Sequence, residues 1–151
     1  MSKSRKAKVL LVEDSPSDQV VIQRAIEDGN IHFELTIAKN GAVALSMLLN
    51  EPPFDDTLGY PQPSLVFMDI NMPILDGKQT LQAIRNNPAL AHIPVIMLTT
   101  SDRDKDVMDS YRMGANAFIT KPVEIKTFIE TFKQLEQFWC KLVTLPNFEN
   151  L

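Results

Sequence analysis

Five polar side chains stand at the ends of short, mostly apolar runs in this 151-residue chain: Glu13, Asp14, Asp69, Thr99 and Lys121. Three of them are acids, and carboxylates that gather at one place repel one another unless a cation intervenes. A hard divalent ion such as Mg²⁺ prefers such oxygen ligands and also accepts phosphate oxygens. A hydroxyl and an ammonium group beside it can stabilise charge on a transferring phosphoryl group. Asp69 would then be the nucleophile, because a carboxylate can form an acyl phosphate.

The apolar runs that carry these residues have the length and the flanking turn signals of buried strands. They predict strands over 8–12, 33–38, 65–68, 94–99 and 117–120, each followed by a helical pattern. Strands that alternate with helices indicate an α/β fold, a three-layer parallel sheet with right-handed crossovers and helices on both faces. Because parallel strands end at the same edge, all five polar residues should lie together there, where ligands bind in such sheets.

Two further patterns concern the helices and the loops. Ser15 before Pro16 predicts the capped start of the first helix, and an amphipathic pattern predicts a long last helix over 125–142. Residues 51–63 form one long proline-rich stretch, unusual inside a compact domain, which indicates a functional loop or an elaborated connection.

Composition narrows the classes of protein. The chain has 44% hydrophobic and 23% charged residues, typical of a globular domain, and its net charge of −4 disfavours binding to nucleic acid. Its single cysteine, Cys140, excludes an intramolecular disulfide, suits a reducing compartment and is expected to be a packing residue. His32 and His92 lack ligand-like spacing and are expected in loops or at the surface. Without a signal peptide or a long apolar run, we expect a cytoplasmic protein with no membrane contact.

The ordered set of motifs resembles the receiver domain of two-component response regulators, of which CheY is the single-domain type. The landmarks are Val12-Glu13-Asp14, Met68-Asp69-Ile70-Asn71-Met72-Pro73, Asp76-Gly77, Leu98-Thr99-Thr100, Gly114-Ala115 and Thr120-Lys121-Pro122. The resemblance covers about residues 7 to 137. It implies a five-stranded sheet in the order 2-1-3-4-5, and a receiver domain over 8–142 between a flexible N-terminal tail (1–7) and a C-terminal tail (143–151).

The resemblance also implies roles for the polar residues. Asp69 would be the phosphoacceptor, and Glu13 and Asp14 would hold Mg²⁺ together with Asp69 and the backbone carbonyl of Asn71. The phosphoryl donor would be the phosphohistidine of a sensor kinase. The protein would catalyse only its own phosphorylation and dephosphorylation.

Three further positions match the parts of the family that sense and transmit phosphorylation. Thr99 would sense the phosphoryl group, and Lys121 would pair with it. Phe118 matches the aromatic residue that turns inward when Thr99 moves, but it could equally be an ordinary core residue. In the family, Asn71 and Ser101 tune the lifetime of the phosphoryl group.

Two departures from the usual receiver pattern look like the small response regulators of cyanobacterial phytochromes: the proline-rich stretch at 51–63 and the ending at 138–146. This similarity implies a phytochrome-type kinase as the upstream partner. It also implies a homodimer through the fourth helix, fifth strand, fifth helix and the tail. An apolar tail could equally fold back on its own helix.

Two other classes of protein compete with this interpretation. A hydrolase of the haloacid-dehalogenase type also has an aspartate after an apolar strand, but it needs a second one two residues later, where this chain has Asn71. A receiver-shaped interaction module that is never phosphorylated usually lacks one of the acid, threonine or lysine positions, and all are present here.

Overall fold

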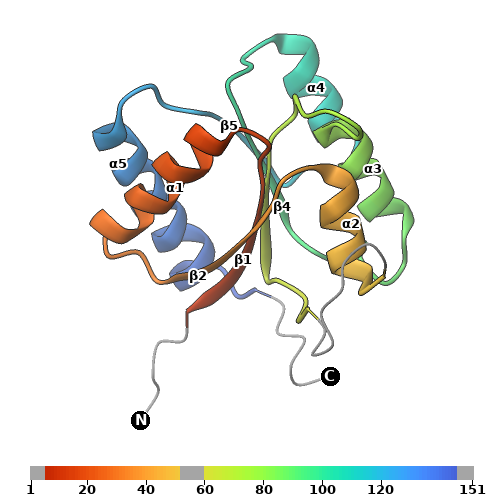
Figure 1. The fold of residues 1–151 in the computed structure, drawn as a ribbon, viewed down its shortest axis with the longest axis horizontal. Coiled ribbons are helices and arrows are strands. Elements are labelled where there is room, and N and C mark those ends of the chain that lie inside the picture. The colour runs from red at the N-terminus through yellow and green to blue at the C-terminus, as the bar shows by residue number, and fades with distance from the viewer. Residues whose placement is uncertain (1–5, 52–59, 146–151) are drawn as a thin grey trace.

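The computed structural model describes residues 6–51 and 60–145, in which five strands alternate with five α-helices (Figure 1). The strands are β1 (Ala7–Val12), β2 (Phe33–Ala38), β3 (Leu65–Met68), β4 (Val95–Thr99) and β5 (Ala117–Thr120). The helices are α1 (Pro16–Asp28), α2 (Gly41–Leu49), α3 (Gly77–Asn86), α4 (Asp104–Arg112) and α5 (Ile125–Leu135), followed by a π-helix, η1 (Glu136–Leu142). No helix within these residues has both the length and the apolar character that crossing a membrane requires.

The sheet is parallel throughout and has the order β2-β1-β3-β4-β5, so the predicted fold class and strand order are confirmed. α1 and α5 cover one face of the sheet, and α2, α3 and α4 cover the other (Figure 1). β1 and β3 are neighbours in the sheet, so their carboxyl ends lie side by side in the middle of the edge at which all the strands end.

Alternate residues of each central strand enter two separate cores, as strands buried on both faces require. In β3, Val66 and Met68 face the α2–α3 side, whereas Leu65 and Phe67 face the α1–α5 side. On that second side, the rings of Phe67 and Phe132 lie 5.6 Å apart in an edge-to-face arrangement. These contacts hold β3, and with it the residue that follows Met68, rigidly in the centre of the domain.

Capping residues set where the helices next to this edge begin. Ser15 accepts a hydrogen bond from the N–H of Asp18, and Pro16 occupies the first helical position, as predicted. Asp76 caps α3 in a capping box with Gln79, in which each side chain bonds the other's backbone N–H. α1 thus starts directly after Glu13 and Asp14, and α3 starts at the end of the loop that follows Asp69.

The boundaries differ from the sequence expectations at both ends of the described chain. β1 already begins at Ala7, whose N–H donates to the carbonyl of His32 at 3.1 Å. The helix expected over 125–142 is α-helical only to Leu135, and residues 136–142 form the π-helix instead. There the buried Glu136 carboxylate accepts hydrogen bonds from the N–H of His32 at 2.6 Å and from its Nδ1 at 3.2 Å. The spacing of apolar residues in the helix could not predict this contact, because the partner lies in a loop far away in the sequence.

The proline-rich stretch lies outside the described residues at 52–59, as does the tail at 146–151. The two flanks of that stretch are joined, because the side-chain amide of Asn50 accepts from the N–H of Tyr60 and donates to its carbonyl. In the C-terminal segment, Trp139, Cys140 and Leu145 pack against the α1–α5 core, whereas Phe138 and Leu142 remain exposed. Cys140 is thus a packing residue, as expected, and burial raises the pKa of its thiol to about 11.

Candidate functional site

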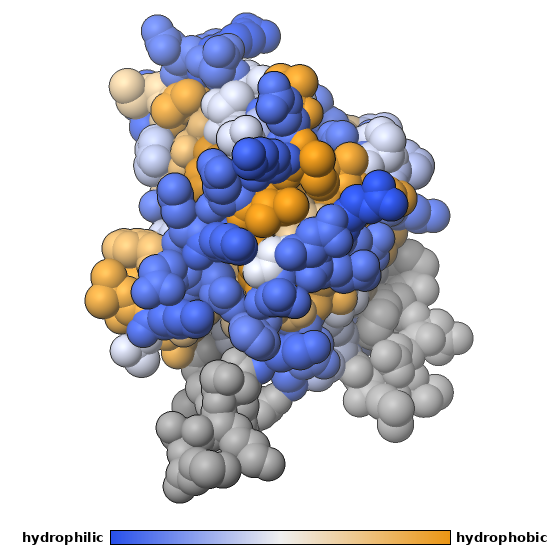
Figure 2. All heavy atoms as spheres, turned by 90° about the vertical axis from the view of Figure 1, so that its left-hand side faces the viewer, coloured by the Kyte–Doolittle hydropathy of each residue, from blue (hydrophilic) through white to orange (hydrophobic). Residues whose placement is uncertain are grey.

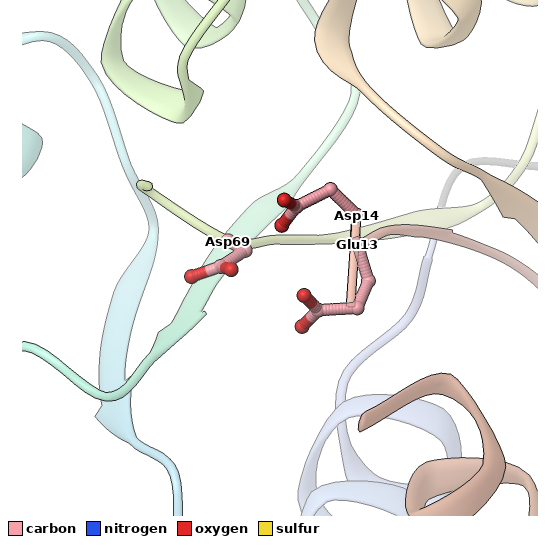
Figure 3. Close-up of side chains that lie close together, drawn as sticks. All are labelled: Glu13, Asp14 and Asp69. Carbon is pink, nitrogen blue, oxygen red and sulfur yellow. The ribbon is translucent and has the colours of Figure 1, made fainter. Parts of the chain in front are cut away.

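Three carboxylates meet where β1 and β3 end. Glu13 and Asp14 follow β1, Asp69 follows β3, and the N–H of Asp69 donates to the carbonyl of Val12 at 3.0 Å. One carboxylate oxygen from each acid lies within 4.8 Å of the other two, and Figure 3 shows the side chains converging from the two strand ends. The ligand oxygens of a Mg²⁺ ion bound at about 2.1 Å are roughly 3 to 4 Å apart. Small rotations would therefore let these acids share one cation.

The three acids differ in their exposure to solvent. Glu13 is fully buried, Asp69 is 7% exposed and Asp14 is half-buried. The carboxylate of Asp69 is oriented by the N–H of Ile70, which donates to its Oδ1 at 2.8 Å, so its Oδ2 is left to face the cluster. The site thus combines two buried acids, Glu13 and Asp69, with one that is accessible to solvent, Asp14. This arrangement suits a cation that keeps several of its water ligands.

Lys121, at the end of β5, supplies the positive charge predicted beside this site. Its ammonium group contacts the carboxylates of Glu13 and Asp18, the latter at 2.9 Å, and lies 3.5 Å from Oδ2 of Asp69. Only 3% of the Lys121 side chain is exposed. A single ammonium group therefore lies among Glu13, Asp18 and Asp69, and its one positive charge is smaller than the combined negative charge of these acids.

The pKa values reflect this imbalance. Burial, opposed by the hydrogen bond from Lys121 and reinforced by the charge of Asp69, raises the pKa of Glu13 to about 7. Burial would lower the pKa of Lys121, but the carboxylates of Glu13 and Asp18 and the charge of Asp69 raise it overall. The ammonium group is thus charged at neutral pH, while Glu13 is partly protonated, chiefly because its carboxyl group is buried. The donor set fits a divalent cation.

The other sequence-predicted residues lie around this cluster. Thr99 is fully buried at the end of β4, and its carbonyl accepts from the N–H of Lys121 at 2.7 Å. Asn71 is exposed in the loop after Asp69. Phe118 is partly buried against the α2–α3 core, and its N–H donates to the hydroxyl of Tyr111 at 3.2 Å. Of the polar side chains predicted at the strand ends, the three acids and Lys121 lie together, Thr99 ends the strand between β3 and β5, and Phe118 lies on β5, two strands from β3.

Gly77 is needed for the close approach of α3 to the site. A Cβ atom at this position would lie 1.9 Å from the carbonyl oxygen of Asp69. The N–H of Gly77 also donates to the carbonyl of Ile70 at 2.8 Å. The pairing of Asp76 with Gly77 in the sequence thus combines a helix cap with a position where no side chain fits.

Two contacts of the site were missed by sequence reasoning. Asp18, an acid in the first turn of α1, binds Lys121. Gln19 donates from its amide to the carbonyl of Glu13 at 2.7 Å. The signal that could have found them is the immediate start of α1 after Asp14, which places its first turn over the same edge.

The fold and the acidic cluster together define a class of protein. The chain belongs to the family of response regulator receiver domains, whose sequence pattern matches residues 9–133. It is 36% identical over 138 residues to response regulator Rcp1 of Synechocystis sp., covering 91% of this chain and 92% of that protein.

Two solved structures of response regulators are similar over nearly the whole chain. Phosphorylated RcpA, a cyanobacterial phytochrome response regulator, has a TM-score of 0.83 and 32% identity, covering 93% of this chain and 99% of RcpA. The Mn²⁺-bound form of Rcp1 has a TM-score of 0.82 and 35% identity, with the same coverage. The predicted family and its cyanobacterial phytochrome branch are confirmed. The chain is not one of the haloacid-dehalogenase-type hydrolases.

Proposed function

We propose that this protein is a phosphorylation-driven switch in which Asp69 takes a phosphoryl group from the phosphohistidine of a sensor kinase. The observation that supports this most directly is the group of three carboxylates with oxygens within 4.8 Å of one another, with Lys121 only 3.5 Å from Asp69. A receiver-shaped interaction module would not need this concentration of buried charge, which costs stability when it serves no ligand.

The proposed reaction is an in-line displacement. Oδ2 of Asp69 attacks phosphorus as the bond from phosphorus to the imidazole nitrogen breaks, and the kinase histidine, protonated on its other ring nitrogen, takes up the electron pair of that bond and leaves as the neutral imidazole. Glu13 and Asp14, with Asp69 and the carbonyl of Asn71, would hold Mg²⁺, which offsets negative charge on the phosphoryl oxygens. The Mn²⁺-bound form of Rcp1 supports a divalent cation in this family.

Lys121 and Thr99 would respond to the new phosphoryl group. Lys121 can exchange one of its present acceptors, Glu13 or Asp18, for an oxygen of a phosphoryl group on Asp69, because these three carboxylates lie around the same ammonium group. The hydroxyl of Thr99 would turn toward the phosphoryl group, and Phe118 would fill the space behind it. The surface formed by α4, β5 and α5 then changes.

The kinase is expected to dock beside the site, on the face formed by α1 and α5. Figure 2 shows apolar side chains surrounded by polar ones on this side of the molecule. Val20 and Ile125 line a groove of about 480 Å³ there, together with Arg24 and Asp28. Val123, just after Lys121, is 99% exposed. Val20 follows Asp18, which binds Lys121, by two residues, so one end of this apolar surface adjoins the site and suits a helical partner that presents a histidine.

The resemblance to RcpA, a phytochrome response regulator, supports a phytochrome-type kinase as the donor. The cytoplasmic location stays a prediction from the sequence. Output would pass through a homodimer formed by the α4–β5–α5 face and the C-terminal segment. Tyr111 and Met108 on α4 and Phe138 and Leu142 in η1 are between 49% and 74% exposed, which leaves apolar surface for such an interface.

Intact-mass measurement after incubation with acetyl phosphate and Mg²⁺ tests the proposed chemistry without a kinase. We expect one added phosphoryl group on the wild type and on Asp102→Asn, a matched control that neutralises an exposed acid near the site. Asp69→Asn, or wild type with a chelator, should gain none. A wild type that never acquires the adduct would favour the unphosphorylated interaction module.

A further inference from the structure

α4 is seated on the domain through polar side chains. Of its nine residues, only Asp106 and Ser110 are buried. α3, by contrast, buries Leu81 and Ile84 in the core. A helix that buries no apolar stripe gains little from the hydrophobic effect and depends on its polar contacts for its position.

Those contacts form a small network, which we call the α4 latch: Lys78, Ser101 and Asp106. The ammonium group of Lys78, in the first turn of α3, donates to Oδ1 of Asp106 at 2.6 Å, and the hydroxyl of Ser101 donates to Oδ2. Lys78 also reaches Asp109 at 3.0 Å. Hydrogen bonds to Asp106 raise the pKa of Lys78, and the bond from Lys78 lowers the pKa of Asp106, so both are charged at neutral pH.

The packing of α4 on the domain also leaves one buried polar group without a partner among the described residues. The hydroxyl of Ser110, one turn after Asp106, is fully buried and has no hydrogen-bond partner among the residues that the structure describes. A buried hydroxyl without a partner carries an uncompensated desolvation cost. The latch therefore stabilises the resting position of α4, whereas the buried hydroxyl of Ser110 destabilises it. Such opposing contributions are expected of a helix that can occupy a second position.

Both ends of the latch adjoin the proposed phosphorylation site. Lys78 directly follows Gly77, the residue against which the backbone of Asp69 packs. Ser101 follows Thr99 by two residues, and its N–H points to the Thr99 hydroxyl oxygen at 3.4 Å. A movement of Thr99 toward a phosphoryl group would pull on Ser101 and hence on its bond to Asp106.

We propose that Lys78 and Asp106 are positioning residues that hold α4 in its resting place through the α4 latch, and that this latch opposes phosphoryl binding at Asp69. This inference rests on the proposed function. Opening the latch costs free energy whenever a phosphoryl group is bound. In a variant without the latch this cost is absent, so the apparent affinity for the phosphoryl group rises.

Two substitutions that change the local charge in opposite directions distinguish an effect of the latch from a simple electrostatic effect on anion binding. The probe is beryllofluoride, an analogue of a phosphoryl group on aspartate, titrated calorimetrically in excess Mg²⁺. Lys78→Met removes a positive charge near an anion site, which by itself weakens anion binding, whereas Asp106→Asn removes a negative charge and by itself strengthens it. We expect both variants to bind beryllofluoride at least threefold more tightly than the wild type.

The matched controls carry the same charge changes without touching the latch. Lys105→Met removes an exposed ammonium group on α4 that contacts Asp109 but not Asp106, and Asp102→Asn removes an exposed carboxylate just before the helix. Both should stay within twofold of the wild type. If Lys78→Met weakens binding while Asp106→Asn strengthens it, or if neither changes it, the latch proposal is wrong.

A second measurement needs no phosphoryl chemistry. Amide hydrogen exchange of the 104–112 peptide, in the unphosphorylated protein, should be several times faster in Lys78→Met and Asp106→Asn than in the wild type or in Lys105→Met, with exchange in β1 and β3 unchanged. Equal exchange rates in all four proteins would overturn the latch. If beryllofluoride failed to bind the wild type, the proposed function would be contradicted, while this exchange experiment would still decide on the latch.

Discussion

The buried carboxylate of Glu13 should make the cation-free protein less stable as the pH rises. Its pKa is raised from 4.5 to about 7, chiefly by burial. A carboxyl group whose pKa is higher in the folded state stabilises the protein below its unfolded pKa, and this contribution is lost as the pH rises through the folded pKa. The loss therefore falls between pH 4.5 and about pH 7.

The expected size follows from the shift. At about 1.4 kcal/mol for each tenfold change in proton affinity, the group contributes about 2 to 3 kcal/mol at pH 5 and almost nothing at pH 8. For a domain of this length, that corresponds to a fall of roughly 5 to 10 °C in Tm. Asp106 and Asp109 do not interfere, because their pKa values are lowered and their contribution is lost only below about pH 4.

Calorimetric unfolding at pH 5 and pH 8 in the presence of a chelator measures this effect. Glu13→Gln should lose most of the difference between the two pH values, whereas Glu130→Gln, at an exposed position of α5, should behave as the wild type. Excess Mg²⁺ should stabilise the wild type more at pH 8 than at pH 5, because the cation binds the ionised acids. Parallel changes of Tm in wild type and Glu13→Gln would refute the assignment of the buried charge to Glu13.

Three further predictions concern single contacts. Gly77→Ala should lower stability by about 3 kcal/mol or more in thermal unfolding, because its Cβ would overlap the carbonyl of Asp69; an unchanged Tm would contradict this. Glu136→Gln should cost about 1 to 2 kcal/mol by weakening the bonds from His32, with Glu130→Gln as the neutral control. Lys121→Met should bind Mg²⁺ roughly tenfold more tightly in a calorimetric titration, since the ammonium group repels a cation held by Asp69. Weaker binding would show that Lys121 instead organises the ligands.

The fold could be predicted from the sequence because the strands are buried on both faces. Runs such as residues 65–68 are continuously apolar, and their alternation with helical patterns leaves a parallel sheet as the solution. The site followed from topology, since parallel strands bring Glu13, Asp69 and Lys121 to one edge whatever the details of packing. This is why residues 108 positions apart could be placed together before any coordinates.

What could not be predicted depends on contacts without a periodic signal. Glu136 looks like a solvated residue of an amphipathic helix, yet it is buried against His32, 104 positions away, and the helix changes to a π-helix there. Likewise, Lys78 lies on an amphipathic helix and Asp106 on a charged one, where a lysine and an aspartate are usually solvated. Only the three-dimensional position of α4 over α3 shows that the two charges meet.

The central claim is that Asp69 forms the acyl phosphate, and the most direct test locates the modified residue. Borohydride reduces an acyl phosphate on aspartate to homoserine, which survives proteolysis and can be assigned by tandem mass spectrometry. After treatment with acetyl phosphate and Mg²⁺, we predict homoserine at position 69 and at neither Glu13 nor Asp14. Reduction at another acid, or no reduced residue in protein that carries the phosphoryl group, would contradict the account.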